Sequence, residues 1–256
     1  MALSLRAATI AVIRAAVLGL ATASAISAQV ACGDTVTTSV TLTADLDCSG
    51  TGLTVGADKI TIDLNGFTID GDNGIGDLGI DNGLGFDGVT IKNGRISSFD
   101  QGISIGTNAQ KNVVTGVRIE SCANQAVDLN DSDLTKITKC TLINNGAGIQ
   151  VGDDATGTVI EKNVIIGSEQ PGVLLLGSGN LVQKNQFTSN TEAVRVLNGG
   201  NRIVGNTVEI SNGDGIAVRD GLGSEVSKNT VLGSAGDGIE VKDAAGTLVT
   251  KNTLNG

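Results

Sequence analysis

The chain has 256 residues, a formal net charge of −10, 37 glycines, one proline and no His, Trp or Tyr. Its length is that of one domain or a small pair of domains, and a hydrophobic content of 40% excludes a wholly disordered chain. The acidic balance and an aromatic content of 2% argue against nucleic acid as a partner.

Residues 1–28 are typical of a cleaved secretion signal. Arg6 and Arg14 supply its positive charge, and an apolar run over 15–28 ends in small residues around Ala25. That run is too short to span a membrane, and no later segment resembles a spanning helix. Cleavage would remove two basic and no acidic residues, for a mature charge of about −12. The sequence therefore predicts a secreted or periplasmic protein.

Residues 29–51 are predicted to form an N-terminal cap segment. Cys32 and Cys48 flank this short polar stretch, and export favours a disulfide between them. The alternative is a lipoprotein acylated on Cys32, although Gln29 stands where a lipobox usually has leucine.

Residues 52–256 contain a repeat of mostly 21 to 23 residues, with one longer spacing of 27. One position of the repeat serves as a reference. In every copy, the side chains three residues before it and two residues after it are apolar. That position is occupied in turn by Phe67, Gly94, Val117, Cys140, Asn163, Asn185, Asn206, Asn229 and Asn252.

Each later repeat also contains a pair of apolar residues separated by one outward residue, which is the period of a strand. A unit of this length cannot bury its own apolar face, but stacked units can, because each strand pairs in parallel with its equivalents above and below. The sequence thus predicts an all-β, single-stranded right-handed parallel β-helix of about nine coils.

The asparagines of the repeat are predicted to form a buried ladder, in which each amide bonds its own turn and the next coil. This ladder comprises Asn163, Asn185, Asn206, Asn229 and Asn252. A second polar corner follows five residues later, at Asn145, Ser168, Asn190, Ser211 and Ser234. Cys122 and Cys140 fall on different corners, so they are expected to be buried free thiols.

The stretch from Cys32 to Gly71 reads CGDTVTTSVTLTADLDCSGTGLTVGADKITIDLNGFTIDG, and it is followed by GVTIKNGRI and recurrent KNTV units. These motifs resemble bacterial secreted right-handed β-helix proteins of the pectate-lyase-like superfamily. The resemblance implies that a substrate lies along the outer face of one parallel sheet. Related sequences tend to carry His where this chain has Phe67, so any role of that His is absent here.

The sheet in question is formed by the strands that carry the repeated apolar pairs. Its outward residues provide two candidate catalytic arrangements. A polysaccharide lyase needs a base and a positive charge near the uronate carboxylate, and Arg195, Arg219 and Lys242 lie on three successive coils. A glycosidase needs two carboxyl groups on either side of the scissile bond. Asp128 is the candidate there, although no carboxylate stands beside it in its column.

Four further acidic residues on this face are candidates for substrate binding: Asp153, Asp220, Glu240 and Asp243. An exposed ladder of surface ion pairs among Arg219, Glu240, Asp220 and Asp243 explains these residues without catalysis. The missing Trp and Tyr, which sugar-binding grooves use as stacking platforms, weaken both enzyme hypotheses.

An acidic, glycine-rich insertion follows the first repeat. Asp70, Asp72 and Asp77 in this loop are candidate ligands for Ca²⁺, although neither the EF-hand spacing nor a Gly-Asp nonapeptide repeat is present.

Lysine precedes the ladder position in five of six consecutive repeats, at Lys139, Lys162, Lys184, Lys228 and Lys251. Stacking would align these side chains into a positive stripe suited to a linear polyanion, or they serve only to keep a β-surface soluble. The last repeat ends without a cap, which favours end-to-end association through the C-terminal coil.

The function favoured by the sequence is therefore an exported scaffold that binds an extended extracellular polymer, such as a polysaccharide, along the outer face of one sheet. The alternative is a carbohydrate-active enzyme, lyase-like, that acts on an acidic polysaccharide.

Overall fold

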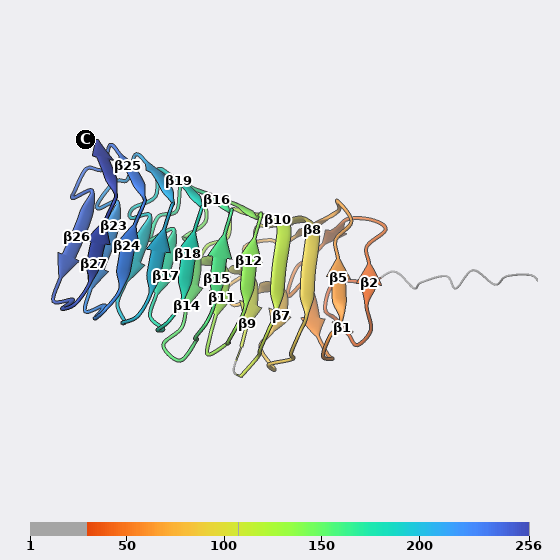
Figure 1. Ribbon diagram of the computed structural model, residues 1–256. Helices are drawn as coiled ribbons and strands as arrows, with labels where there is room; N and C mark the ends of the chain where they lie inside the picture. Colours follow the sequence, from red (N-terminus) through yellow and green to blue (C-terminus); the bar gives the residue numbers. More distant parts are fainter. Residues whose placement is uncertain (1–29, 107, 256) are drawn as a thin grey trace, which may run out of the picture.

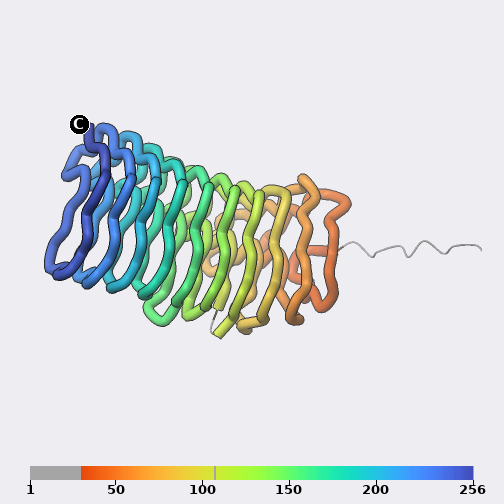
Figure 2. The backbone as a smooth tube through the Cα atoms, in the orientation of Figure 1, coloured from red at the N-terminus to blue at the C-terminus, as the bar shows by residue number. Residues whose placement is uncertain are grey.

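The computed structural model describes residues 30–106 and 108–255, and every regular element in this part of the chain is a strand. The strands belong to coils that stack one on another along a single axis (Figure 1). Figure 2 shows the same coils as successive rungs from the N-terminal to the C-terminal end. The predicted β-helix is confirmed. In the described part of the chain, no helix is long and apolar enough to cross a membrane.

One face of the solenoid is a ten-stranded parallel sheet, here called sheet A, to which each coil contributes one strand. Its strands, in order, are β1 (Asp34–Val36), β4 (Leu53–Val55), β7 (Leu78–Asn82), β9 (Gln101–Ile105), β11 (Gln125–Leu129), β14 (Ala147–Val151), β17 (Val173–Leu175), β20 (Val194–Val196), β23 (Ile216–Arg219) and β26 (Ile239–Lys242).

The other strands of each coil form two further parallel rows. Row two contains β2 (Val40–Thr41), β5 (Thr61–Asp63), β12 (Lys136–Thr138), β15 (Val159–Glu161), β18 (Leu181–Gln183), β21 (Arg202–Val204), β24 (Glu225–Ser227) and β27 (Leu248–Thr250). Row three contains β3 (Leu46–Asp47), β6 (Thr68–Asp70), β13 (Thr141–Ile143), β16 (Val164–Ile166), β19 (Gln186–Thr188), β22 (Thr207–Glu209), β25 (Thr230–Leu232) and β28 (Thr253–Asn255). Both rows are joined within the long strands β8 (Thr90–Ser97) and β10 (Val113–Glu120).

The N-terminal segment is itself built as a coil. Its strands β1, β2 and β3 pair in parallel with β4, β5 and β6 of the next coil. Sheet A therefore has one strand more than the nine repeats visible in the sequence. The disulfide predicted between Cys32 and Cys48 is present within this first coil. The predicted signal at 1–28 lies outside the described residues.

The coils bend at three corners, and most corners contain a residue with a left-handed backbone conformation at a recurring position. At the first corner, between sheet A and row two, these residues are Lys59, Gly88, Lys111, Leu134, Gly157, Gly179, Gly200, Gly223 and Gly246. At the second corner, between rows two and three, they are Gly66, Asn93, Gly116, Lys139, Lys162, Lys184, Gly205, Lys228 and Lys251. At the third corner, before the next coil, they are Ser98, Ser121, Asn144, Gly167, Ser189, Ile210 and Gly233.

The predicted asparagine ladder occupies the second corner, directly after the left-handed residues. Asn185 is typical: its Oδ1 accepts from the backbone N–H of Asn163, and its Nδ2 donates to the carbonyl of Ile160. Its Nδ2 also donates to Oδ1 of Asn206, at 3.0 Å. The same contacts join Asn163, Asn206, Asn229 and Asn252 to their neighbours. The ladder thus satisfies buried backbone groups, as expected.

The other two corners use similar clamps. At the third corner, Oδ1 of Asn145 accepts from the N–H of Cys122, and Oδ1 of Asn190 accepts from the N–H of Ser168. At the first corner, Asn180 and Asn201 bond in the same way, an arrangement that sequence reasoning missed. The signal was weak because threonine and serine alternate there with asparagine, as in Thr135, Thr158 and Ser224.

The interior is a single apolar column made of the inward residues of all three strand rows. Cys122 and Cys140 lie in it as buried free thiols, as predicted. Burial raises the pKa of each thiol to about 11.

Candidate functional site

The outer face of sheet A presents one continuous column of outward residues, and its predicted register is confirmed. Strand pairing places one residue per coil directly beside the next, about 4.8 Å apart. From β4 to β26 the column reads Thr54, Asp81, Ser104, Asp128, Gln150, Leu174, Arg195, Ala217 and Glu240.

Asp128 is the centre of a hydrogen-bonded amide cluster in the middle of this column. Its carboxylate accepts from Nδ2 of Asn130 at 3.2 Å, Nε2 of Gln150 at 3.3 Å and Nε2 of Gln101 at 3.5 Å. Gln101 also donates to Gln125, which donates in turn to Gln150. The cluster joins three coils into one polar patch.

Although Asp128 points outward, its side chain is buried, with only 5% of the residue exposed. This desolvation raises the pKa of Asp128, and the bonds from Asn130, Gln150 and Gln101 oppose the shift. A carboxyl group with a raised pKa on an outer face is a candidate for proton transfer.

A second cluster, of ion pairs, lies further along sheet A around Arg219. The guanidinium of Arg219 contacts Glu240 at 2.5 Å, Asp214 at 2.8 Å and Glu192 at 3.3 Å. Arg195 contacts the other oxygen of Glu192, at 2.6 Å. The hydrogen bond with Glu240, followed by the charges of Glu192, Glu240 and Asp214, raises the pKa of Arg219.

This arrangement bears on the predicted catalytic residues. Arg219 and Lys242 are neighbours in register, as expected. However, three carboxylates already surround Arg219, whereas Lys242 is exposed and has no ion pair among the described residues. Of the two, Lys242 is the side chain that is free to meet a substrate.

Sequence reasoning missed Glu192 and Asp214. Each precedes its sheet A strand by two residues, in the position that Gln101 and Gln125 occupy in earlier coils. Extending the strand alternation two residues toward the N-terminus reveals this additional column of outward residues. Glu192 is only 4% exposed, so its charge is held almost entirely by the two arginines.

The predicted substrate-binding aspartates lie at the ends of the strands. Asp153, Asp220 and Asp243 are all exposed, and Asp220 and Asp243 have left-handed backbones with φ of 58° and 52°. Within the described residues, neither Asp220 nor Asp243 pairs with Arg219. Of the three carboxylates expected to pair with Arg219, Glu240 does so, and the expected ladder of ion pairs is wrong for the two turn residues.

The acidic loop brings Asp72 and Asp77 together beside Gly74 but adds no third carboxylate to them among the described residues. Asp70 accepts from the hydroxyl of Ser97, and Asp72 accepts from the backbone N–H of Gly74. In residues 30–106 and 108–255, no three acidic, His or Cys side chains are grouped so as to hold a metal ion. Calcium binding by Asp70, Asp72 and Asp77 stays a prediction, and a calcium titration of the thermal midpoint would test it.

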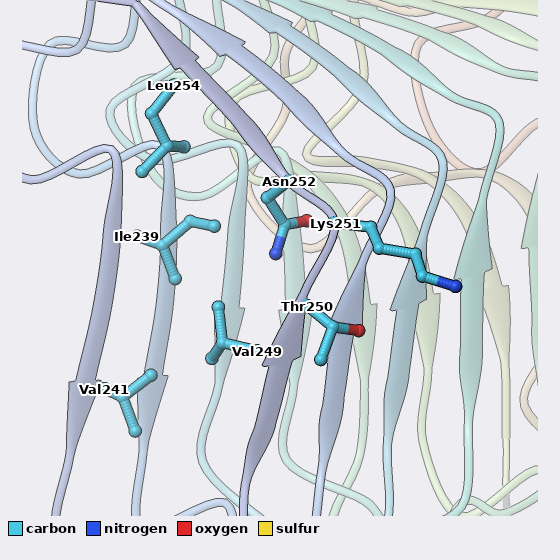
Figure 3. Close-up of a pocket in the computed structure, with 7 residues that line it drawn as sticks. All are labelled: Ile239, Val241, Val249, Thr250, Lys251, Asn252 and Leu254. Carbon is cyan, nitrogen blue, oxygen red and sulfur yellow. The ribbon is translucent and has the colours of Figure 1, made fainter.

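The final described coil leaves part of the apolar interior open. A hollow of about 350 Å³ is lined by Ile239, Val241, Val249, Thr250, Lys251, Asn252 and Leu254 (Figure 3). Val241, Val249 and Leu254 are each roughly half exposed, although their equivalents in earlier coils are buried.

A family model described as "Right handed beta helix region" matches residues 35–187 and 147–256, and the chain belongs to this family. The handedness expected from the sequence is thereby confirmed. No curated protein matches the chain.

Several solved structures share the fold. A mutant of the periplasmic alginate epimerase AlgG aligns with a TM-score of 0.60 and 12% identity, covering 82% of this chain and 62% of that one. PfbA, a surface adhesin of Streptococcus pneumoniae, aligns with 0.60 and 14%, covering 78% and 61%. A mutant tailspike protein of the Escherichia coli bacteriophage HK620, in complex with a hexasaccharide, aligns with 0.59 and 13%, covering 87% and 50%. The chain spans less than two thirds of each of these proteins, and such low identity shows the fold alone.

Proposed function

We propose that this protein is an exported scaffold that binds an extended extracellular polysaccharide along the outer face of sheet A. The observation that carries the proposal is the amide cluster of Gln101, Gln125, Asn130 and Gln150 around Asp128, which repeats polar contacts on consecutive coils. A polymer running along the stack meets polar side chains on the three consecutive coils of this cluster, so several weak hydrogen bonds add up.

Two of the similar structures support a carbohydrate partner. AlgG is an alginate epimerase, and the HK620 tailspike was solved with a hexasaccharide. The absence of Trp and Tyr in this chain means that hydrogen bonds rather than ring stacking would provide the affinity.

The proposal is tested by measuring the affinity of the protein for defined oligosaccharides of alginate and pectate. Replacing both Gln125 and Asn130 by alanine removes two amides of the cluster. We expect a loss of at least about tenfold in affinity, because each net hydrogen bond contributes roughly 1 kcal/mol. Unchanged affinity in a folded variant would remove this site.

A second candidate function, catalysis on a carbohydrate, is favoured by the raised pKa of the buried Asp128. Asp81 occupies the same outward column two coils away, a separation of about 9.6 Å from the coil rise. That is close to the roughly 6.5–9.5 Å between the two carboxyl groups of inverting glycosidases. For a lyase, Lys242 would be the base beside Arg219.

Activity screens on pectate and alginate distinguish these chemistries. Unsaturated products absorbing at 235 nm or so would indicate a lyase, and new reducing ends alone would indicate a hydrolase. Asp128→Asn is expected to abolish hydrolysis, and Lys242→Ala to abolish elimination. Activity that survives both substitutions would place the chemistry elsewhere.

Export is proposed from the predicted signal together with the Cys32–Cys48 disulfide, which is typical of an oxidising compartment outside the cytoplasm. N-terminal sequencing of the protein recovered from the periplasm or medium tests it. A mature chain beginning between Ile26 and Ala31 fits the proposal, and an intact Met1 in the cytoplasm would contradict it.

End-to-end association is a separate proposal, in which a second copy covers the open face formed by Val241, Val249 and Leu254. The unpaired edges of β26, β27 and β28 at this face offer backbone groups for pairing. Light scattering across a concentration series tests the proposal, with Val249→Lys as the disrupting variant. A monomer at every concentration would refute it.

A further inference from the structure

The lysines of the second corner form a single file across the last coils. The lysine row is defined as Lys139, Lys162, Lys184, Lys228 and Lys251. Backbone hydrogen bonds fix the stacking: each corner N–H donates to a carbonyl of the next coil, as Lys162 does to Gln183 and Lys184 does to Val204. Neighbouring positions are thus about 4.8 Å apart. All five lysines are exposed, and Gly205 is the one gap between Lys184 and Lys228.

The backbone at this corner does not favour lysine. The five lysines have φ between 55° and 58°, a left-handed conformation that costs an L-residue roughly 1–2 kcal/mol. Glycine avoids this cost, and Gly205 fills the corner in one coil with a φ of 66°. At the first corner the same requirement is met by glycine in the last five coils. The left-handed turn therefore does not explain why lysine occupies this corner.

The row carries positive charge that is not held in ion pairs, although the charges of Lys162 and Lys228 help to lower the pKa of the nearby Glu161 and Glu225. Within the described residues, none of its five lysines has an ion pair. The carboxylates on the adjoining outward positions of row two, Glu161 and Glu225, are already engaged by Lys136 and Arg202. A protein with a net charge of −10 thus presents one distinctly basic strip.

Figure 3 shows the direction of the last member, Lys251, which extends away from the core residues Ile239, Val241 and Val249. The next residue, Asn252, turns its amide to the inside. The left-handed turn thus sends the lysine into solvent while the ladder residue remains part of the fold.

Neutral hydrogen-bonding side chains run alongside the lysine row. They occupy the first outward position of row three in five of the six coils, with Val164 as the exception, and they stack in register. These side chains are Thr141, Gln186, Thr207, Thr230 and Thr253. None of them is buried.

We propose that the lysine row and its neighbouring hydroxyls bind a linear acidic polysaccharide of the polyuronate class, laid along the stack. A head-to-tail sugar unit is about as long as the ~4.8 Å coil rise, so one carboxylate can meet each lysine. The threonines and Gln186 are then within reach of the sugar hydroxyls. Single-stranded nucleic acid fits less well, because the row has no aromatic side chain on which bases stack.

This site lies on the second corner and is independent of the proposed binding face on sheet A. The two are tested separately, since each has its own variants. The probe is polygalacturonate, with dextran as the neutral polymer, and affinity is measured at low and at raised salt.

The central test is a double variant that carries both Lys162→Gly and Lys184→Gly. Glycine keeps the left-handed turn, so the fold is retained, and the loss of two charges is expected to weaken binding to polygalacturonate about tenfold at low salt. Dextran binding should not change. The salt dependence of the affinity should become shallower.

The matched control is a double variant that carries both Lys59→Gly and Lys111→Gly. Both lysines are exposed and left-handed, with φ of 57° and 58°, but they lie at the first corner. The control removes the same charge from the same backbone conformation, and we expect less than a twofold change. An equal loss in the control would overturn the proposal in favour of general charge attraction.

Filling the gap provides a gain-of-function test. A Cβ at Gly205 meets no atom within 4 Å, and the φ of 66° is close to that of the neighbouring lysines. Gly205→Lys places a lysine on all six consecutive coils. We expect the affinity for polygalacturonate to rise two- to fivefold, which corresponds to the contribution of one exposed charge pair.

Three further results would overturn the proposal: wild-type affinity in the Lys162/Lys184 variant, no gain with Gly205→Lys, or equally tight binding of an oligothymidylate. If instead the Gln125/Asn130 variant alone abolishes polygalacturonate binding, the lysine row is excluded and the sheet A proposal stands.

Discussion

The first and second corners of the coil have the same backbone geometry but are built from different residues. In the C-terminal coils each places one left-handed residue before a polar residue, and where that residue is asparagine its amide clamps the preceding coil. In the last five coils, the first corner has glycine followed by Thr158, Asn180, Asn201, Ser224 or Thr247. The second corner has lysine in all but one of these coils, followed always by asparagine. The comparison separates two roles: the clamp serves the fold, whereas the residue before it is free to serve the surface.

The largest expected effect concerns the clamp of the second corner. Asn185→Ala removes the partners of the Asn163 N–H and the Ile160 carbonyl, both buried. Each unsatisfied group costs about 1–3 kcal/mol, so a destabilisation of about 3 kcal/mol or more is expected in chemical unfolding. Asn252→Ala, in the more exposed last coil, should cost clearly less. Equal costs at both positions would show that burial does not set the strength of the ladder.

The cysteines that replace clamps at the second and third corners provide the next test. Cys140 and Cys122 are buried, with pKa values of about 11 against a usual value of 9.0. At pH 8 the thiolate fraction is therefore roughly a hundredfold lower than that of an ordinary thiol. A thiol reagent should modify neither residue in the native protein and both after denaturation without reductant. Rapid modification of native Cys140 would mean that the second corner opens on its own.

Exchanging the left-handed residues between the two corners should have a moderate effect on stability. Lys184→Gly relieves the left-handed strain and is expected to stabilise the fold by about 1 kcal/mol, while Gly179→Lys costs a similar amount. The double exchange should be nearly neutral. Thermal unfolding measures all three. Destabilisation by Lys184→Gly would indicate that the lysine contributes to the fold after all.

The smallest effect is expected at the first corner, where Thr158 is a poor clamp. Its hydroxyl is buried and has no hydrogen-bond partner. Thr158→Val keeps the shape and removes the unsatisfied group, so stability should rise by up to about 1 kcal/mol. A clear loss of stability in unfolding experiments would mean that the hydroxyl has a partner in solution, such as an ordered water.

Much of this architecture could be predicted from the sequence because two periods act together. The alternation within strands fixes which side chains point outward, and the repeat fixes which of them stack. Asp128, Arg195 and Glu240 therefore fall in the predicted column.

What the sequence did not reveal depends on contacts between coils. The burial of Asp128 arises from Gln101 and Gln150 on neighbouring coils, and the neutralisation of Arg219 involves Glu192 and Asp214, which lie just before the strands. Such contacts depend on the reach and conformation of side chains, which periodicity does not determine. The first coil escaped notice for a related reason, since the short strands β2 and β3 carry too few apolar residues to display the repeat.

The bonds between the asparagine amides and buried backbone groups all run in one direction, from each coil back to the one before it. The buried backbone groups of a corner are therefore satisfied only after the next coil has formed. This favours folding of the coils in order from the N-terminus. The coils can fold one after another as the chain is synthesised. On heating, unfolding is expected to begin at the C-terminal coil.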